Sequence, residues 1–503
     1  MPLLEVFAAD PEKVAAIQDM IFEAQMVGRS CHLWEYPRRS IPSFDVETEF
    51  IAYSSPESTY AVTKRLFDGA KSSILVGIYD FTAGYVEELL LKAMRRGVKV
   101  ALMLDLDNRT GETEVYDNLV KHGCEGVPAP SCASQNEAAY FASSHEKVIV
   151  IDGEWVLVQS GNYSENSIPQ NETDGGDAED FIPGNRDMGV AVRSKALASF
   201  FAKVLRRDMD LELRGAPEAA ALRRKLRGDG LELFEAAPSS PPTELFPSKI
   251  FKPSKPIRVQ PILSPDNYME EIPKWLRAAK KSVYIEQQYI RGSQEKIGEC
   301  MQAIADARTA HPDLDVRIIV ARPFPGKSFD KEAKAIRDLR QFGVKLGENI
   351  RILNPKNFVH CHNKLIVVDD TTVLISSQNW SDAALVKNRE AGLLLHYPEM
   401  ARHYSKIFQS DWETARQTLT RKTKPELFGP ESLATGKTVP INPGDYVVFG
   451  DDEDFRPPRK RPPDLSALSA ERVRRRRRRP ARPRARSARP GPNRRPRRRT
   501  GKR

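Results

Sequence analysis

The chain has 503 residues, of which 40% are hydrophobic and 29% charged, and a net charge of +10. This composition is ordinary for a folded enzyme and indicates a globular protein. The charge is unevenly distributed, because residues 456–503 carry +20 and the rest of the chain carries −10. Net charge therefore gives only the tail an attraction for polyanions, and a phosphate site in the acidic body requires a local arrangement of cations.

Two features bear on the compartment. No segment approaches the roughly eighteen consecutive apolar residues of a transmembrane helix, so we expect a cytoplasmic protein whose contact with membranes is peripheral. The cysteines are odd in number and include no C-x-x-C pair, which argues against a complete disulfide framework and a structural zinc site and favours a reducing compartment. They are Cys31, Cys124, Cys132, Cys300 and Cys361.

In chain order, the sequence divides into two similar halves with extensions. The Arg/Pro-rich tail lacks the apolar residues needed for a core and is predicted to be disordered. The predicted boundaries are 1–48 for an N-terminal extension with a helix at 14–26, 49–215 for the first half, 216–255 for a linker, 256–420 for the second half, 421–455 for a C-terminal segment and 456–503 for the tail.

The two halves repeat each other. Ser55-Pro56 recurs as Ser264-Pro265, and the strand-like run at 74–81 recurs at 283–290. Strand and helix patterns alternate in both halves, which predicts an α/β fold with a mixed or parallel sheet in each. Two such halves related by a pseudo-twofold axis would form one body.

The strongest match between the halves is the motif H-x-K-x-x-x-x-D, which is followed in both copies by Ser-x-Asn. The second copy of the whole pattern lies 217 residues after the first. On a strand, residues two apart project from the same face, so the histidine and the lysine lie side by side. The first copy consists of His145, Lys147, Asp152, Ser160 and Asn162, and the second of His362, Lys364, Asp369, Ser377 and Asn379.

This inventory suits a phosphodiester. An imidazole attacks or transfers a proton, an ammonium binds a non-bridging oxygen, and hydroxyl and amide groups are neutral donors to the same phosphate. Two copies that face each other place one imidazole on each side of the phosphorus, as in-line displacement requires. A single H-x-K match is more often structural than catalytic, but two complete copies at one offset favour a catalytic site.

The duplicated motif resembles that of the phospholipase D superfamily, which includes bacterial phospholipases D and cardiolipin-synthase-like enzymes. The similarity spans roughly residues 49–416. It implies two α/β sandwich halves whose motifs meet in a central cleft, a phosphohistidine intermediate, and neither metal nor cofactor. The segment Glu286-Gln287-Gln288-Tyr289 resembles one common in the second half of such enzymes and favours a lipid substrate.

The resemblance also implies a role for each residue. His145 is expected to be the nucleophile and His362 the general acid and then the base. Two acids, Asp187 and Glu390, match positions that bond the imidazoles and fix their tautomers. The phosphate-binding positions are Lys147, Lys364, Asn162 and Asn379, with Ser160 and Ser377 in support, while the motif aspartates Asp152 and Asp369 are included in the site but are expected to be more structural than catalytic.

Three functions remain open from the sequence. The leading hypothesis is a phosphodiesterase that cleaves or transfers the phosphatidyl group of a phospholipid. The alternative is an endonuclease, for which the tail would hold DNA or RNA, and the same tail could instead bind anionic lipid. The third is a non-catalytic module, which the intact residues of both copies disfavour. A monomer suffices for one site.

The first half carries an acidic insertion at 168–184 beside its motif. Pro and Gly punctuate this stretch, which predicts a surface loop. Such a loop either gates the substrate or is a tolerated insertion.

Overall fold

The computed structural model describes residues 31–106, 111–134, 136, 138–215, 238, 240–323, 327–422 and 446–449. The predicted helix at 14–26, residues 216–237 of the predicted linker and the predicted disordered tail lie outside these residues.

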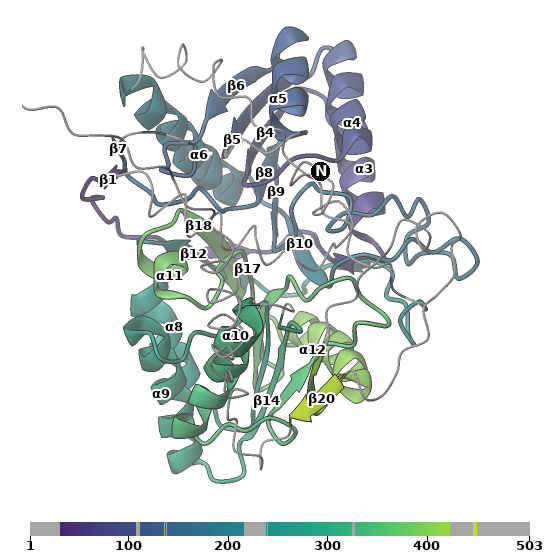
Figure 1. The fold of residues 1–503 in the computed structure, drawn as a ribbon. Coiled ribbons are helices and arrows are strands. Elements are labelled where there is room, and N and C mark those ends of the chain that lie inside the picture. The colour runs from purple at the N-terminus through teal and green to yellow at the C-terminus, as the bar shows by residue number, and fades with distance from the viewer. Residues whose placement is uncertain are drawn as a thin grey trace, which may run out of the picture. The chain divides into compact units, whose positions relative to one another are not determined.

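The first half contains an eight-stranded mixed sheet, drawn in purple to teal in Figure 1. Strands β4, β5 and β6 are parallel, and the other neighbours are antiparallel. In spatial order the strands are β11 (Lys249–Phe251), β3 (Phe50–Ser55), β10 (Asp187–Arg193), β9 (Trp155–Gln159), β8 (Val148–Ile151), β4 (Ser73–Ile78), β5 (Lys99–Leu104) and β6 (Glu125–Pro128).

The second half repeats this order in its own eight-stranded sheet. In spatial order the strands are β15 (Ile350–Ile352), β14 (Asp315–Val320), β13 (Ser282–Gln287), β16 (Lys364–Val368), β17 (Thr372–Ser376), β18 (Glu390–Leu395), β12 (Ile257–Ser264) and β2 (Phe44–Val46). Seven strands correspond between the sheets, which confirms the predicted pair of α/β halves. The edge strands β2 and β11 correspond to each other but are exchanged: β2 precedes β3 in the chain and pairs with β12, whereas β11 precedes β12 and pairs with β3.

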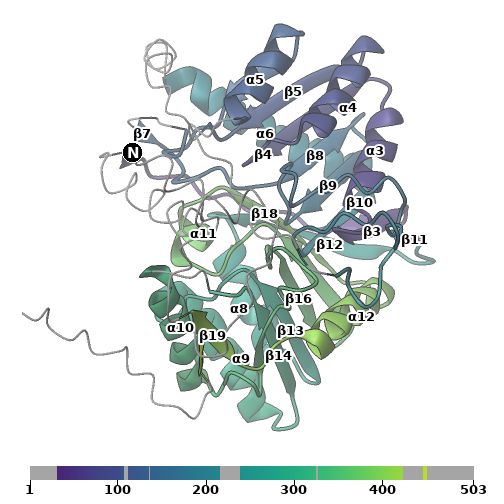
Figure 2. The same ribbon diagram turned by 45° about the vertical axis from the view of Figure 1, so that its right-hand side comes forward.

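Helices cover the sheets. In the first half, α3 (Thr59–Asp68) lies beside α4 (Gly84–Arg95), next to the sheet in Figure 2, followed by α5 (Glu112–Lys121) and α6 (Lys195–Gly215). The second half has α8 (Tyr268–Arg277), α9 (Glu295–Ala310), α10 (Lys327–Asp338), the 3-10 turn η1 (Leu339–Phe342), α11 (Asp382–Val386) and α12 (Pro398–Thr414).

The buried run of β8 shows why the motif strands are apolar throughout. Val148 and Val150 belong to a core cluster that also contains second-half residues, whereas Ile149 and Ile151 belong to the cluster under α3 and α4. A strand buried on both faces has no polar side, so its sequence does not alternate. The shared cluster joins the halves through one apolar core.

A tight turn follows each motif strand. Asp152 and Gly153 have φ of 54° and 63°, and Asp369 and Asp370 have φ of 56° and 53°. The amide of Glu154 donates to the carbonyl of Ile151 across the first turn, as Thr371 does to Val368 in the second. Asp, Asn and Gly tolerate the positive φ of the two central residues best. The turn at Asp152 and Gly153 is therefore explained by the residues that form it.

The cysteine expectation needs correction. Cys31 and Cys132 form a disulfide with a Cα–Cα distance of 5.8 Å, beside the two-stranded pairing of β1 (His32–Leu33) with β7 (Ala138–Ala139). Cys124, Cys300 and Cys361 are free and buried. An odd count excludes full pairing but not a single bridge, so the sequence argument for reduced cysteines was wrong for this pair. A further small sheet joins β19 (Leu419–Lys422) and β20 (Tyr446–Phe449).

None of the helices in the described ranges is long and apolar enough to cross a membrane.

The acidic insertion is anchored at several points. Nδ2 of the Asn171 side chain donates to the Pro56 carbonyl (2.9 Å), and Oδ1 of the same side chain accepts from the backbone amide of Ile182 (2.8 Å). Asp174 accepts from the backbone amide of Ser248 at 2.6 Å. The insertion thus packs on the corner after β3 and on the segment before β11.

Candidate active site

Each motif histidine is held by a carboxylate of the opposite half. Nδ1 of His145 lies 2.8 Å from Oε2 of Glu390, and Nδ1 of His362 lies 3.0 Å from Oδ1 of Asp187. The two histidines are 8% and 9% exposed. The sequence predicted acids that bond the imidazoles, and the structure adds that the pairs cross between the halves. One site therefore requires both halves.

Backbone hydrogen bonds join the same segments. The amide of His145 donates to the carbonyl of Arg389 (2.8 Å), and the amide of His362 donates to the carbonyl of Arg186 (3.1 Å). In return, the Arg389 amide donates to Ser143 and the Arg186 amide to His360, both at 2.8 Å. The backbone of each histidine is thus bonded to the arginine that directly precedes the acid of the other half, and this bond fixes where the imidazole lies.

The two motif serines hold the acids. Ser160 Oγ donates to Asp187 Oδ1 and Ser377 Oγ donates to Glu390 Oε2, both at 2.6 Å. Each hydroxyl also accepts a backbone amide, from Met188 or from Ala391, at 3.0 Å. A serine hydroxyl has one hydrogen to donate, and in this arrangement the carboxylate receives it.

Both motif lysines are buried beside their histidines. Lys147 Nζ donates to the carbonyl of His145 at 2.7 Å, and Lys364 Nζ donates to that of His362. Burial lowers the pKa of Lys147 to about 7 and that of Lys364 to about 8, against the opposing effect of nearby carboxylates. Lys364 also acts on Lys147, so the two motifs share one electrostatic environment.

The pKa values of the two acids shift in opposite directions. Burial raises the pKa of Glu390 to about 7, even though Lys147 opposes the rise. Burial also acts on Asp187, but His362, Lys364 and the Ser160 hydroxyl outweigh it, and the pKa of Asp187 lies below its ordinary value. The carboxylate beside His362 is therefore firmly ionised.

Burial and the neighbouring Lys364 lower the pKa of His362 to about 4. A negatively charged ligand at this site would offset the repulsion by the lysines and raise the pKa of His362 toward neutrality.

Asn162 and Asn379, two residues after the serines, are each 8% exposed. Within the described part of the chain, no hydrogen bond reaches Oδ1 of either. Buried polar atoms without a protein partner are uncommon, and an amide oxygen of this kind calls for a donor such as a water or a donor group of a ligand.

The motif aspartates lie at the opposite end of the strands from the histidines. Oδ1 of Asp152 accepts from the amides of Ser72 (2.7 Å) and Ser73 (2.9 Å). Asp369 likewise accepts from the amides of Lys281 (2.6 Å) and Ser282 (2.9 Å). Both aspartates bind the start of a neighbouring strand, as expected for structural residues.

Two buried arginine clusters flank the site and were not predicted. Arg186 pairs with Glu57 of its own half (2.8 Å) and with Asp411 of the other (2.9 Å). Arg389 repeats this with Asp266 (2.8 Å) and Asp208 (2.7 Å). The guanidinium groups lie over Phe358 and Phe141, respectively. Both clusters tie the residue that precedes a histidine-bonding acid to the long helix of the opposite half.

Two further residues surround the motifs. The ring of Tyr79 packs on that of His145 with a centroid distance of 4.7 Å and lies 5.2 Å from Lys147 Nζ. Glu286 is fully buried and accepts from the amide of Asn363 at 3.2 Å. The segment that favoured a lipid substrate thus begins with a residue that supports the motif strand from within the sheet.

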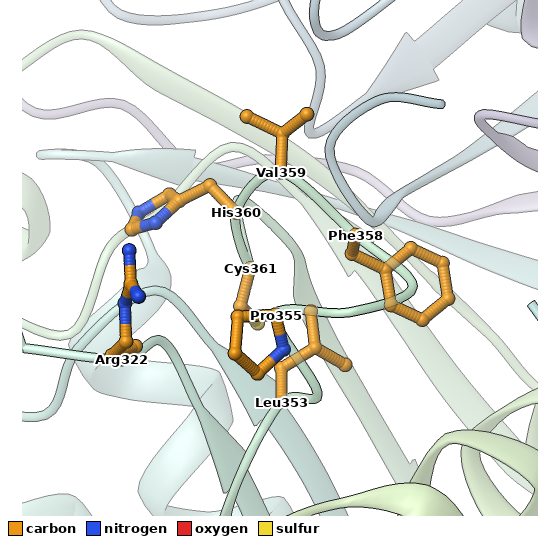
Figure 3. A pocket seen from close by; sticks show the side chains of 7 residues that line it. All are labelled: Arg322, Leu353, Pro355, Phe358, Val359, His360 and Cys361. Atoms are coloured by element: carbon orange, nitrogen blue, oxygen red, sulfur yellow. The ribbon is translucent and has the colours of Figure 1, made fainter. Parts of the chain in front are cut away.

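The pocket in Figure 3 lies next to the second motif. In that view the side chains of Arg322 and His360 point toward each other. The volume of the pocket is about 10 Å³. That is room for about one water. Burial, His362, Lys364 and Arg322 lower the pKa of His360 to about 3, so this histidine is neutral near pH 7 and lacks the charge state of a general acid.

The sequence contained a signal for the arginine clusters. Asn-Arg-Asp at 185–187 recurs as Asn-Arg-Glu at 388–390, and Asp208 recurs as Asp411 at the same offset of 203 residues. Reading on from the acids into the following helices would have identified these residues. No offset reveals which half supplies the partner.

The family model described as cardiolipin synthase, PLD-like domain, matches residues 63–209 and 272–412, one match in each half. The solved phosphatidylserine synthase of Haemophilus influenzae Rd KW20 is similar over 75% of this chain and 89% of its own, with a TM-score of 0.52 and 15% identity. Nuc, a phospholipase D family member from Salmonella typhimurium, is similar over 32% of this chain and 97% of its own, with a TM-score of 0.27 and 23% identity. No curated protein sequence matches. Since the family model covers both halves and more than half of the residues, this chain belongs to the phospholipase D-like domain family that the model describes.

Proposed function

We propose that this protein cleaves or transfers the phosphatidyl group of a phospholipid through a phosphohistidine intermediate. The observation that carries the proposal is the crossed arrangement of two histidines, each oriented at Nδ1 by a carboxylate of the other half, with both motif lysines beside them. Membership in the cardiolipin synthase-like family supports the lipid substrate.

In the proposed reaction, Nε2 of His145 attacks the phosphorus and the bond to the head-group oxygen breaks. His362, protonated while the substrate is bound, gives its proton to that oxygen. His362 then removes a proton from water or a lipid alcohol, whose oxygen attacks the phosphohistidine and releases His145. Hydrolysis and phosphatidyl transfer differ only in this acceptor.

The assignment of roles rests on the two acids. An ionised Asp187 stabilises the imidazolium of His362, as a general acid requires. Glu390 holds His145 with Nε2 directed to the phosphorus. Lys147, Lys364, Asn162 and Asn379 bind the phosphate oxygens, and the positive charge of the two lysines takes the place of a metal ion. The serines position the acids.

The location stays a prediction. Peripheral membrane contact is compatible with a lipid substrate, whereas the Cys31–Cys132 disulfide counts against a reducing compartment.

The test measures head-group release from phosphatidylcholine and phosphatidylglycerol vesicles in EDTA, beside cleavage of single- and double-stranded DNA. We expect release that disappears in His145→Ala and persists in the control His122→Ala, because His122 is an exposed histidine at the end of α5. Added lipid alcohol then distinguishes transfer from hydrolysis. DNA cleavage with inert vesicles would establish the endonuclease alternative instead.

A further inference from the structure

A segment at the N-terminus of the described chain bridges both halves. Residues 31–46, called here the strap, begin at the Cys31–Cys132 disulfide and at β1, which pairs with β7 in the first half. They end at β2, which pairs with β12 in the second half. Along the way the amide of Arg39 donates to Asp266 Oδ1 at 2.9 Å. The strap is therefore attached on both sides of the active site.

The middle of the strap contacts the Arg389 cluster. The hydroxyl of Tyr36 accepts from Nη2 of Arg389 (2.7 Å) and from Nη2 of Arg207 (3.0 Å). The Tyr36 ring lies 5.0 Å from that of Phe141 and 4.9 Å from the Arg389 guanidinium carbon. Arg389 precedes Glu390 and bonds the backbone of His145. Tyr36 thus contacts the residue next to Glu390, the acid that orients His145.

The other half shows what is special about Tyr36. Arg186 and Arg389 have matching partners in their two acids and their aromatic ring. Among the hydrogen bonds of the described residues, none joins Arg186 to a tyrosine. The strap therefore adds a contact to the His145 side of a pseudo-symmetric site, where an extra contact changes one histidine and not the other.

The disulfide also reaches the segment that leads into the first motif. Between the end of the parallel strands and the motif histidine, the first half runs from Ala129 to His145 and the second from Leu353 to His362, so the first is seven residues longer. Cys132 lies in this longer loop. Asp105 holds the loop by accepting from the hydroxyls of Ser131 (2.5 Å) and Ser143 (2.9 Å).

We propose that Tyr36 is a positioning residue for the His145–Glu390 pair, and that the Cys31–Cys132 disulfide fixes the strap that carries it, so that reduction of this disulfide lowers turnover. A dithiol reductant supplies two electrons and two protons, the sulfur–sulfur bond breaks into two cysteine thiols, and the dithiol becomes a cyclic disulfide. The strap is then held at its second-half end alone, and Tyr36 loses its fixed place on Arg389. This inference rests on the proposed function.

The experiment uses the full chain and bis(4-nitrophenyl) phosphate, a soluble phosphodiester. After mass spectrometry has established the Cys31–Cys132 linkage, kcat and KM are measured with and without dithiothreitol. Loss of one positioning hydrogen bond predicts a decrease in kcat of about fivefold with little change in KM. Cys31→Ser should reproduce the decrease and abolish the response to reductant, whereas Cys124→Ser, which removes a buried free thiol, should respond like the wild type.

Tyr36→Phe separates positioning from folding. It keeps the ring and removes the acceptor, so we expect kcat to fall in the oxidised protein while the melting temperature stays close to that of the wild type. Equal kcat in oxidised and reduced protein, a Tyr36→Phe variant with wild-type kcat, or a protein isolated without the linkage would each overturn the proposal.

A second readout does not depend on catalysis. Amide hydrogen exchange at 386–392 should accelerate on reduction, because Arg389 loses its contact with the strap. If the wild type cleaves no phosphodiester, the proposed function fails, and this measurement still tests whether the disulfide holds the strap against Arg389. Exchange that is unchanged by dithiothreitol would refute it.

Discussion

The crossed pairs predict that an acid in one half affects the histidine of the other. Asp187→Asn replaces the carboxylate 3.0 Å from His362 by a neutral amide of the same shape. A charge-assisted hydrogen bond contributes about 1.5–3 kcal/mol, and this range corresponds to a decrease in kcat of roughly 10- to 160-fold. The loss should occur in the step in which His362 protonates the leaving oxygen.

The assay compares leaving groups. 4-Nitrophenolate departs without a proton, whereas an alkoxide requires one, so Asp187→Asn should reduce cleavage of an alkyl phosphodiester far more than cleavage of a 4-nitrophenyl diester. Glu390→Gln acts on the nucleophile His145 and should reduce both substrates alike. If Asp187→Asn slows both substrates equally and Glu390→Gln shows the leaving-group dependence, the assignment of roles is wrong. Equal dependence in both variants would refute the crossed arrangement.

Three further predictions concern stability and pH. Asp411→Ala leaves the buried Arg186 without one partner and should lower the free energy of unfolding by about 3–5 kcal/mol. The control Asp68→Ala breaks the exposed 2.7 Å pair with Lys64 and should lower it by less than about 1 kcal/mol. Urea denaturation measures both losses, and equal losses would contradict the argument. Partial burial of Asp152 is outweighed by backbone hydrogen bonds that hold its pKa below the usual value, so its stabilisation is complete at neutral pH and is lost as the pH falls below about 4; Asp152→Asn should remove this acid dependence and leave kcat per folded molecule unchanged. Burial lowers the pKa of Lys147 to about 7, so Lys147 should lose its positive charge as the pH rises above 7. The affinity for dimethyl phosphate, which is a monoanion over this whole pH range, should then weaken in titration calorimetry. An affinity that stays constant from pH 6 to 9 would show that Lys147 does not bind the phosphate as an ammonium.

The fold was accessible from sequence because the chain repeats itself. Strand runs after Lys71 and Lys281 and the motif strands gave the α/β halves, since a strand buried on both faces is apolar without alternation. The edge strands β2 and β11 were missed for a physical reason: each has three residues, too few to show periodicity.

The site was predictable in composition and less so in connection. Spacing on a strand places His145 beside Lys147, but the partner of His145 lies 245 residues away in the other half, and no local pattern encodes that. Ser160 was expected at the phosphate, and the structure gives its hydrogen to Asp187 instead. A hydroxyl suits either acceptor, so only the geometry chooses between them.

The single disulfide shows another limit. Cysteine counting treats bridges as a framework, whereas Cys31 and Cys132 form one link between a terminal segment and a loop. Neither cysteine has a repeated counterpart, so the duplication offered no guidance.

The reciprocal hold between the halves restricts how the enzyme can move. A clamshell opening would break both imidazole–carboxylate pairs and the backbone bonds of Arg186 and Arg389 together, and it would expose the apolar core that the halves share. Neither histidine would then be ready for chemistry. Separation of the halves therefore costs all of these contacts at once, which disfavours domain closure as the way a substrate reaches the site.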